Sequence, residues 1–395
     1  MKYNFDNIVD RSGTDSMKWE HISMFYPKAQ DDVLSMWVAD MDFACAPQIL
    51  DAIKQRTDRQ ILGYSHSSNE QFLDAVQGWF SRRFNWTVDK ESIVYAPGIV
   101  PALGFLANIL AEEGEGILIQ RPVYYPFTRM IEKNNRKLVN NPLRYQNGDW
   151  FMDLDDLENK IVSENVKAIF FCSPHNPTGR VWTVTELEGF LSICKRHNLW
   201  VVSDEIHFDL IRKGIKHTPL ELIDPSYKHR IITCTAPSKS FNLAGVQLSN
   251  IVINDEEMRN NWHEFMHGRF GLGDPNAFAL VACQAAYNEA ESWLNQVNEY
   301  IDGNFNFIRE FINENNLKMR LVGGEGTYLA WIDMRAYNLT DEQLTELVLE
   351  KANIALDDGY IFGEEGTGFQ RINVACPRSR VVQCMNSLKA AFSGL

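Results

Sequence analysis

Short apolar runs alternate with helical patterns through the middle of the chain. Four runs look like strands, and each ends before a proline, a serine or an acidic residue: GEGILIQRP, VKAIFFCSP, NLWVVSDE and RIITCTAPS. Helical segments lie between them, for example residues 185–198, where Thr183 or Thr185 is the expected N-cap. This alternation predicts parallel strands joined by helical crossovers. In such a sheet, functional side chains gather at the carboxyl ends of the strands.

The last hundred residues follow a different pattern. One long helix is expected from about Trp293 to Asn316, followed by the strand-like GGEGTYLAWIDM, the helical TDEQLTELVLEKAN and the strand-like QRINVAC. This order predicts a smaller α/β domain with an antiparallel element. The N-terminal residues are too few for a domain of their own, so we expect them to join it. The predicted large domain covers residues 45–288, and the small domain combines residues 1–44 with residues 289–395.

Composition and charge narrow the classes of function. The chain has 395 residues, of which 45% are hydrophobic and 23% charged, as is usual for a soluble globular protein. Its net charge of −14 argues against a broad surface for nucleic acid or an anionic membrane. The N-terminus lacks the apolar core of a signal peptide, and the seven scattered cysteines form no C-x-x-C pair. We therefore expect a cytoplasmic protein with reduced thiols, no metal site and a small-molecule ligand.

Lys239 is the first candidate for chemistry. It follows a predicted strand in TCTAPSKSFNLAG, where Thr235, Ser238 and Ser240 supply hydroxyl groups and Gly245 permits close backbone approach. A lysine in this position is either a solvated loop residue or a desolvated amine. Desolvation makes an amine lose its proton more easily, as an amine that forms a Schiff base must.

Asp204 and Asn176 also follow predicted strands. A buried aspartate is costly unless it is paired, and a pyridinium nitrogen would pair Asp204; the alternatives are a helix N-cap or a metal-ligating acid. Asn176 lies in SPHNPTGR, whose dipeptides predict a tight turn. That turn would also present the side-chain amide to the phenolic oxygen of a bound ring.

Two further segments could hold a ligand. Gly98 lies in YAPGIVPAL, where a helix begins, and backbone N–H groups at a helix start bind phosphate. Tyr124 and Tyr125 follow another predicted strand. One of these tyrosines could stack on a pyridine ring, or both could be ordinary surface or core aromatics.

Taken together, these segments resemble the fold-type I pyridoxal-phosphate enzymes of the aminotransferase superfamily. They occur in that family's order: PGIVPAL, RPVYYPF, SPHNPTGR, SDEIHFDL, TAPSKSFNLAG and RINVACP. Within the superfamily, MWVADMDF, SDEIHFDL and SKSFNLAG are most similar to the MalY/PatB-type cystathionine β-lyases, also called C–S lyases. The resemblance covers nearly the whole chain from about Phe5. It implies a three-layer αβα large domain with a mostly parallel sheet, plus a smaller α/β domain.

The resemblance also implies pyridoxal 5′-phosphate as the cofactor. Lys239 would carry it as a Schiff base, Asp204 would pair with its ring nitrogen, and Tyr124 would stack on the ring as a third catalytic residue. The implied remaining cofactor contacts are Asn176 to the phenolic oxygen, Gly98, Ile99 and Ser238 to the phosphate, His207, and Tyr64 from the neighbouring subunit of a homodimer with shared sites. The implied substrate contacts are Arg371, which would clamp the α-carboxylate, Tyr125 and Trp37.

The implied reaction is β-elimination from cystathionine or another L-cysteine S-conjugate, which yields a thiol, pyruvate and ammonia. An aminotransferase on the same fold is the first alternative. Two departures weaken it, because aspartate-type aminotransferases have a tyrosine where this chain has His207 and an arginine where it has Gln247. A non-catalytic binding protein is the second alternative, and the intact Lys239 and Asp204 argue against it.

Overall fold

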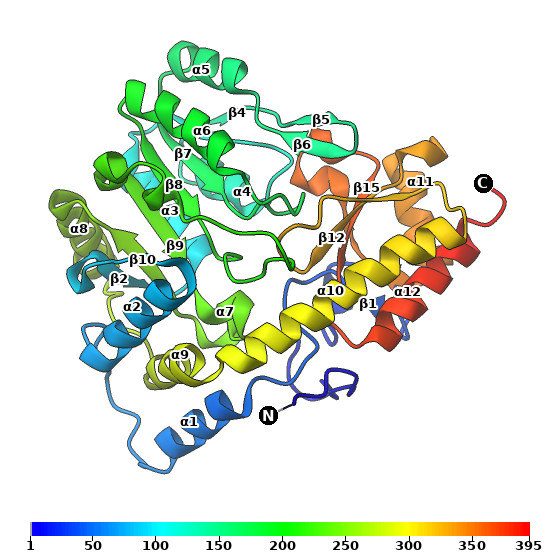
Figure 1. Ribbon diagram of the computed structural model, residues 1–395, viewed down its shortest axis with the longest axis horizontal. Coiled ribbons are helices and arrows are strands. Elements are labelled where there is room, and N and C mark those ends of the chain that lie inside the picture. Colours follow the sequence, from blue (N-terminus) through cyan, green and yellow to red (C-terminus); the bar gives the residue numbers. More distant parts are fainter. Residues whose placement is uncertain (1) are drawn as a thin grey trace.

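A seven-stranded sheet forms the centre of the larger part of the molecule in the computed structural model, which describes residues 2–395 (Figure 1). From edge to edge its strands are β2 (Ile93–Ala96), β10 (Ser249–Ile253), β9 (Ile231–Thr235), β8 (Trp200–Asp204), β7 (Val166–Cys172), β3 (Gly116–Ile119) and β4 (Lys137–Asn140). All neighbours from β9 to β4 pair in parallel, whereas β10 is antiparallel to both β9 and β2. The predicted mostly parallel α/β sheet is therefore confirmed.

The central strands β7, β8 and β9 are buried on both faces, which explains why their sequences are mostly continuous apolar runs. Successive side chains point to opposite faces of a strand. Phe170 and Val202 accordingly belong to one hydrophobic core, and Phe171 and Val201 belong to the other.

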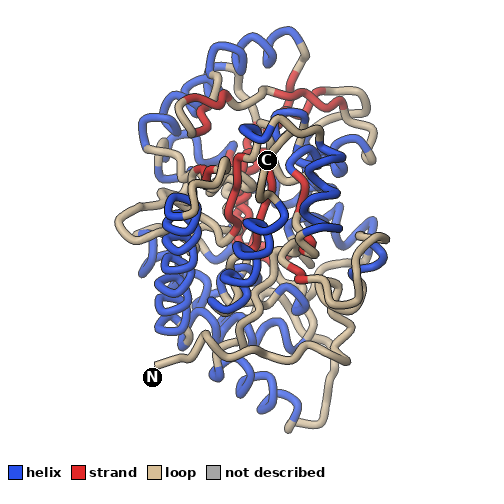
Figure 2. The backbone as a smooth tube through the Cα atoms, turned by 90° about the vertical axis from the view of Figure 1, so that its right-hand side faces the viewer, coloured by secondary structure: helices blue, strands red, loops and turns tan. Residues whose placement is uncertain are grey.

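Helices cover both faces of this sheet, as Figure 2 shows by the strands enclosed between helical layers. Helices α3, α4 and α8 pack in one core, and α5 and α6 pack in the other. The helices of this part are α1 (Pro47–Thr57), α2 (Glu70–Phe84), α3 (Ile99–Leu110), α4 (Pro126–Glu132), α5 (Leu154–Ser163), α6 (Val184–Arg196), α7 (Pro237–Ser240), α8 (Glu256–His263) and α9 (Ala277–Glu289). Within residues 2–395, no helix combines the length and apolar content needed to cross a membrane.

Helix α6 illustrates how the sequence sets the start of a helix. Thr183 is its N-cap, and the Thr183 hydroxyl accepts a hydrogen bond from the backbone N–H of Glu186. In return, the Glu186 carboxylate accepts from the backbone N–H of Thr183 at 2.8 Å. This reciprocal capping satisfies two N–H groups that the helix leaves unpaired. Of the two expected N-cap residues, Thr183 and Thr185, the structure therefore has Thr183.

A separate four-stranded antiparallel sheet lies beside the large one. Its order is β11 (Arg320–Val322), β12 (Leu329–Asp333), β15 (Phe369–Asn373) and β14 (Asp357–Asp358), and its helices are α10 (Glu291–Glu314), α11 (Asp341–Thr345) and α12 (Arg378–Ala391). The long helix α10 runs diagonally past both sheets (Figure 1). The helix expected in TDEQLTELVLEKAN changes after α11 into a π-helix over residues 346–351. Strands β5 (Arg144–Gln146) and β6 (Asp149–Phe151) form a small two-stranded sheet of their own.

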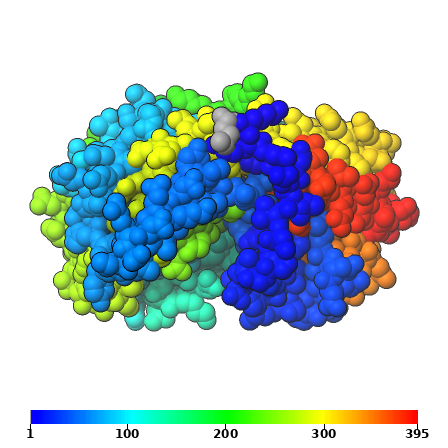
Figure 3. All heavy atoms as spheres, turned by 90° about the horizontal axis from the view of Figure 1, so that it is seen from below, coloured from blue at the N-terminus to red at the C-terminus, as the bar shows by residue number. Residues whose placement is uncertain are grey.

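The N-terminal segment lies against the C-terminal part of the chain. Strand β1 (Leu34–Ser35) pairs in parallel with β13 (Ile354–Ala355), and the guanidinium of Arg380 lies 4.1 Å from the ring centre of Trp19. Figure 3 shows this segment in dark blue, running across the face of the molecule next to the red C-terminal helix. The boundaries proposed for the two domains stay a prediction.

Candidate active site

Lys239 lies in the short helix α7, directly after strand β9. Its Nζ atom donates a hydrogen bond to the carbonyl oxygen of Ala39 at 2.6 Å. Burial lowers the pKa of this amine to about 8; the negative charge of Asp40 opposes the shift and the positive charge of Arg371 adds to it. The lysine lines an internal cavity rather than a solvated loop. Such an amine is partly unprotonated near neutral pH, as a base or nucleophile must be.

Asp204 is the last residue of β8 and is buried. Burial raises the pKa of its carboxyl to about 7, although a hydrogen bond from the N–H of Ile206 at 3.1 Å and the charge of Lys239 both oppose that shift. A turn follows Asp204, so it is not the N-cap of a helix. Among the described residues, no group of three or more His, Cys, Asp or Glu side chains is placed to hold a metal ion. A buried carboxylate of this kind would be stabilised by a cation placed beside it.

The turn that carries Asn176 follows a strand of the large sheet and contacts residues of the small sheet and of the loop before it. Nη1 of Arg371, on strand β15, donates to the Asn176 side-chain oxygen at 2.9 Å. Gly179 has φ +72°, and a Cβ atom there would lie 2.9 Å from the backbone nitrogen of Gly324. A side chain would thus collide with the facing backbone, so glycine permits the close approach. Both sheets therefore contribute residues to this region.

A cavity of about 130 Å³ lies where these elements meet. The predicted residues that line it are Lys239, Asp204, Asn176, Tyr124, Gly98, Ile99, Ser238 and His207. Gly98 and Ile99 stand at the start of α3, whose first backbone N–H groups have no partner within the helix. The structure thus brings together side chains that lie far apart in the sequence, as the rule about carboxyl ends of strands predicts.

His207 is buried beside Lys239 and Arg371. Loss of solvent, reinforced by these two positive charges, holds the pKa of its imidazole well below the ordinary value. The imidazole is therefore neutral. Its Nδ1 atom is buried and has no hydrogen-bond partner among the described residues. A residue that lines the cavity thus carries one buried polar atom without a partner in the described part of the chain.

Four predicted residues lie outside the cavity lining. Arg371 is hydrogen-bonded to Asn176, which lines the cavity. Nη2 of Arg371 also donates to the backbone oxygen of Trp37 at 3.2 Å. Tyr125 adjoins Tyr124 and is 37% exposed. Tyr64 is fully exposed, and none of its atoms lines the cavity.

Several residues of this region were not predicted, and three of them make polar contacts with the predicted ones: Ala39, Tyr328 and Asp357. The carbonyl oxygen of Ala39 accepts from both Lys239 and the hydroxyl of Tyr328, the latter at 2.8 Å. Asp357 forms an ion pair with Arg371. The quoted motif MWVADMDF contains Ala39 but gives no sign that a backbone carbonyl would be the functional group. Asp357 lies in no motif, and only the strand pairing reveals its place.

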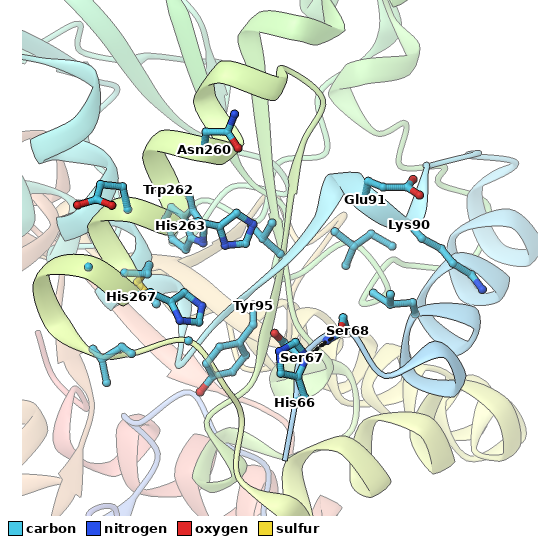
Figure 4. A pocket seen from close by; sticks show the side chains of 18 of the residues that line it. His66, Ser67, Ser68, Lys90, Glu91, Tyr95, Asn260, Trp262, His263 and His267 are labelled. Carbon is cyan, nitrogen blue, oxygen red and sulfur yellow. Dashed lines mark hydrogen bonds between the residues drawn. The ribbon is translucent and has the colours of Figure 1, made fainter. Parts of the chain in front are cut away.

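A second, larger hollow of about 970 Å³ lies elsewhere on the molecule and contains none of the predicted residues. Figure 4 shows His66, Ser67 and Ser68 on one side of it and His263 and His267 on another, with Tyr95 between them. Exposed apolar side chains occur in the same segments: Ile61, Leu62, Phe270 and Leu272. This hollow is an open surface feature, distinct from the cavity around Lys239.

Comparison with known proteins gives matches over almost the full length. The model of the family described as "Aminotransferase class I and II" matches residues 31–388. Cystathionine beta-lyase PatB of Bacillus subtilis is 39% identical, covering 99% of this chain and 100% of its own, and protein MalY of Escherichia coli is 34% identical, covering 98% and 99%. The crystal structure of the PLP-bound C-S lyase from Staphylococcus hominis matches with a TM-score of 0.93 and 35% identity, covering 100% of this chain and 99% of its own.

Proposed function

The chain belongs to the family of class I and II aminotransferases, and we propose that it is a pyridoxal-phosphate-dependent carbon–sulfur β-lyase. It acts on cystathionine or other L-cysteine S-conjugates and releases a thiol, pyruvate and ammonia. The full-length similarity to PatB and to the Staphylococcus hominis lyase carries this proposal. The arrangement of Lys239 and Asp204 around one cavity supports it.

The residues around the cavity fit pyridoxal phosphate. The Asp204 carboxylate offers the pyridine nitrogen a negative partner, and Asn176 offers its side-chain amide to the phenolic oxygen. The start of α3 and the Ser238 hydroxyl offer donors for the phosphate. The neutral His207 adds a polar atom that has no partner in the described part of the chain, and Tyr124 supplies an aromatic face.

When bound, the cofactor withdraws electrons from the α-carbon of the substrate and stabilises negative charge there. The chain's own residues then have three tasks. Arg371 holds the α-carboxylate, because a guanidinium can bind both carboxylate oxygens. Lys239 removes the α-proton, since its lowered pKa provides an unprotonated amine near neutral pH. Asp204 keeps a positive charge at the ring nitrogen.

The products distinguish elimination from amino-group transfer. We expect thiol, pyruvate and ammonia to appear in equal amounts from L-cystathionine or an S-alkyl-L-cysteine, with no added 2-oxo acid. The β-thiolate is a leaving group, so the electron pair left by the α-proton expels it. Product analysis by thiol titration and a coupled pyruvate assay measures the ratio. Strict dependence on a 2-oxo acid, without thiol release, would make the chain an aminotransferase.

A dimer with shared sites is part of the proposal. Tyr64 is fully exposed and carries no contact to the cavity of its own subunit. It lies in a loop with Ile61 and Leu62, which expose 73% and 60% of their surfaces. An exposed apolar patch of this kind is a common mark of a protein interface. The hollow of Figure 4 borders the same loop, and we propose that a second copy of the chain covers this surface and brings Tyr64 to its neighbour's phosphate.

Complementation tests the shared site. Tyr64→Phe and Lys239→Ala are each expected to be severely impaired, and mixing them should restore activity. In a mixed dimer, one of the two sites receives both natural residues. Random exchange should give about one quarter of wild-type activity per subunit. Each variant mixed with itself is the control, and no recovery after verified subunit exchange would contradict the shared site.

The proposed location is the cytoplasm. All seven cysteines are free thiols in the structure, and six of them are buried. Free cysteines are the usual state in a reducing compartment.

A further inference from the structure

Arg371, the proposed clamp for the substrate carboxylate, already has a carboxylate partner inside the protein. Strands β14 and β15 pair so that Asp357 lies directly opposite Arg371. Residues opposite one another in an antiparallel pair share a face, which brings the two side chains together. They form an ion pair in which the side chains are 5% and 3% exposed. The clamp is therefore neutral as a pair before any substrate arrives.

The guanidinium nevertheless retains donors for a second carboxylate. It carries five N–H groups. Its hydrogen bonds go to Asn176, to the backbone oxygen of Trp37 and to Asp357. Its Nε atom is buried and has no partner among the described residues. A substrate carboxylate that uses the remaining donors would share the single positive charge with Asp357.

Two carboxylates on one buried cation leave an uncompensated negative charge. The charged groups that act on Asp357 are Arg371 from the facing strand and the neighbouring Asp358, which repels it. Tyr26, Tyr124 and Tyr125 also lie close enough to interact with Asp357, and none of them can supply a positive charge. Burial raises the pKa of Asp357 above its ordinary value even though Arg371 opposes the shift. A third negative group close by raises the cost of ionisation again.

We propose that Asp357 takes up a proton from solvent when an α-carboxylate binds Arg371, and loses it when the ligand leaves. This rests on the proposed role of Arg371 in the lyase. Asp357 is thus a positioning residue: it holds the guanidinium toward Asn176 in the free enzyme, and protonation releases the positive charge to the substrate. Only the O–H bond on Asp357 forms and breaks, so the step needs no further reactant.

The coupling fixes the direction of a pH effect. A ligand that binds together with a proton binds less tightly as pH rises, by up to about tenfold per pH unit. The effect spans the interval between the pKa of Asp357 in the free enzyme and its higher pKa in the complex. Below this interval the proton is already present, and above it no proton is taken up.

Calorimetry measures the proton directly. The probe is 3-(methylthio)propanoate, which has the carboxylate of S-methylcysteine but no amine to react with the cofactor. Titration of the holoenzyme in buffers of different ionisation enthalpy gives the number of protons taken up per ligand bound. Measured from about pH 5 to pH 9, where buried carboxyl groups titrate, the wild type should pass through a maximum approaching one proton. Asp357→Asn should show none.

Asp358→Asn is the matched control, because Asp358 is adjacent in sequence but is bound to Gln370 rather than to Arg371. It should keep the proton uptake. Binding to the wild type without any proton uptake overturns the role of Asp357 and leaves the lyase proposal intact. Equal binding to the wild type and to Arg371→Ala overturns the clamp and this inference with it, while thiol release from cysteine conjugates still tests the reaction separately.

Discussion

Replacing Lys239 by alanine is expected to lower kcat for thiol release by at least about 10³-fold, within the range that a positioned proton-transfer group contributes. The loss is large because one amine both holds the cofactor and removes the α-proton. Noncovalent contacts from Asp204 and the start of α3 should still retain some cofactor. The measurement is kcat with L-cystathionine, together with the visible absorbance of the purified protein.

Lys216→Ala is the control for this prediction. Lys216 is an exposed lysine outside the cavity, so its removal should leave kcat and absorbance unchanged. Borohydride reduction of the wild type, followed by peptide mapping, should find the cofactor on Lys239. A label on another lysine would show that the site has been assigned to the wrong residue.

Asp204→Asn is expected to lower kcat by about 10³-fold. Two opposite charges roughly 4 Å apart at an effective dielectric constant near 20 interact by about 4 kcal/mol before desolvation, and each 1.4 kcal/mol lost from transition-state stabilisation costs about tenfold in rate. Asparagine keeps the shape of the side chain and can still accept the N–H of Ile206. The change therefore removes the charge that keeps the ring nitrogen protonated. Steady-state kinetics measures the effect.

Thermal stability, measured together with the amount of bound cofactor, separates a chemical defect from a structural one in this variant. We expect Asp204→Asn to keep its thermal stability near that of the wild type, because a buried carboxyl with a raised pKa is costly to ionise. If the variant turned over at the wild-type rate with cofactor bound, Asp204 would not be the partner of the ring nitrogen.

The parallel sheet was predictable because its central strands are buried on both faces. Runs such as the one in VKAIFFCSP are continuous and apolar, and each stops where a strand ends and polar residues begin. The residues just beyond these stops include Lys239, Asp204 and Asn176, which share one edge of the sheet. The same rule therefore predicts these parts of the candidate site from the sequence alone.

Other features depend on contacts that periodicity cannot encode. Asp357 faces Arg371 only because of the register between two short strands. Ala39 acts through its carbonyl oxygen, and a backbone atom has no side-chain signature. The π-helical turns over residues 346–351 have a composition suited equally to an α-helix. Tertiary packing decides these details, and a single sequence shows them only through resemblance.

The pairing of β1 with β13 has a consequence for biosynthesis. A ribosome makes residues 34–35 long before residues 354–355, their partners in the sheet. At about 5–20 residues per second, the first segment waits some tens of seconds. Throughout that time the apolar side chains of MWVADMDF lack the C-terminal part of the surface that later buries them. The carbonyls of Val38 and Asp40, on either side of the one that Lys239 contacts, gain their partner Asn373 only when translation is almost finished, so the surroundings of Lys239 are completed late although its own segment is made midway.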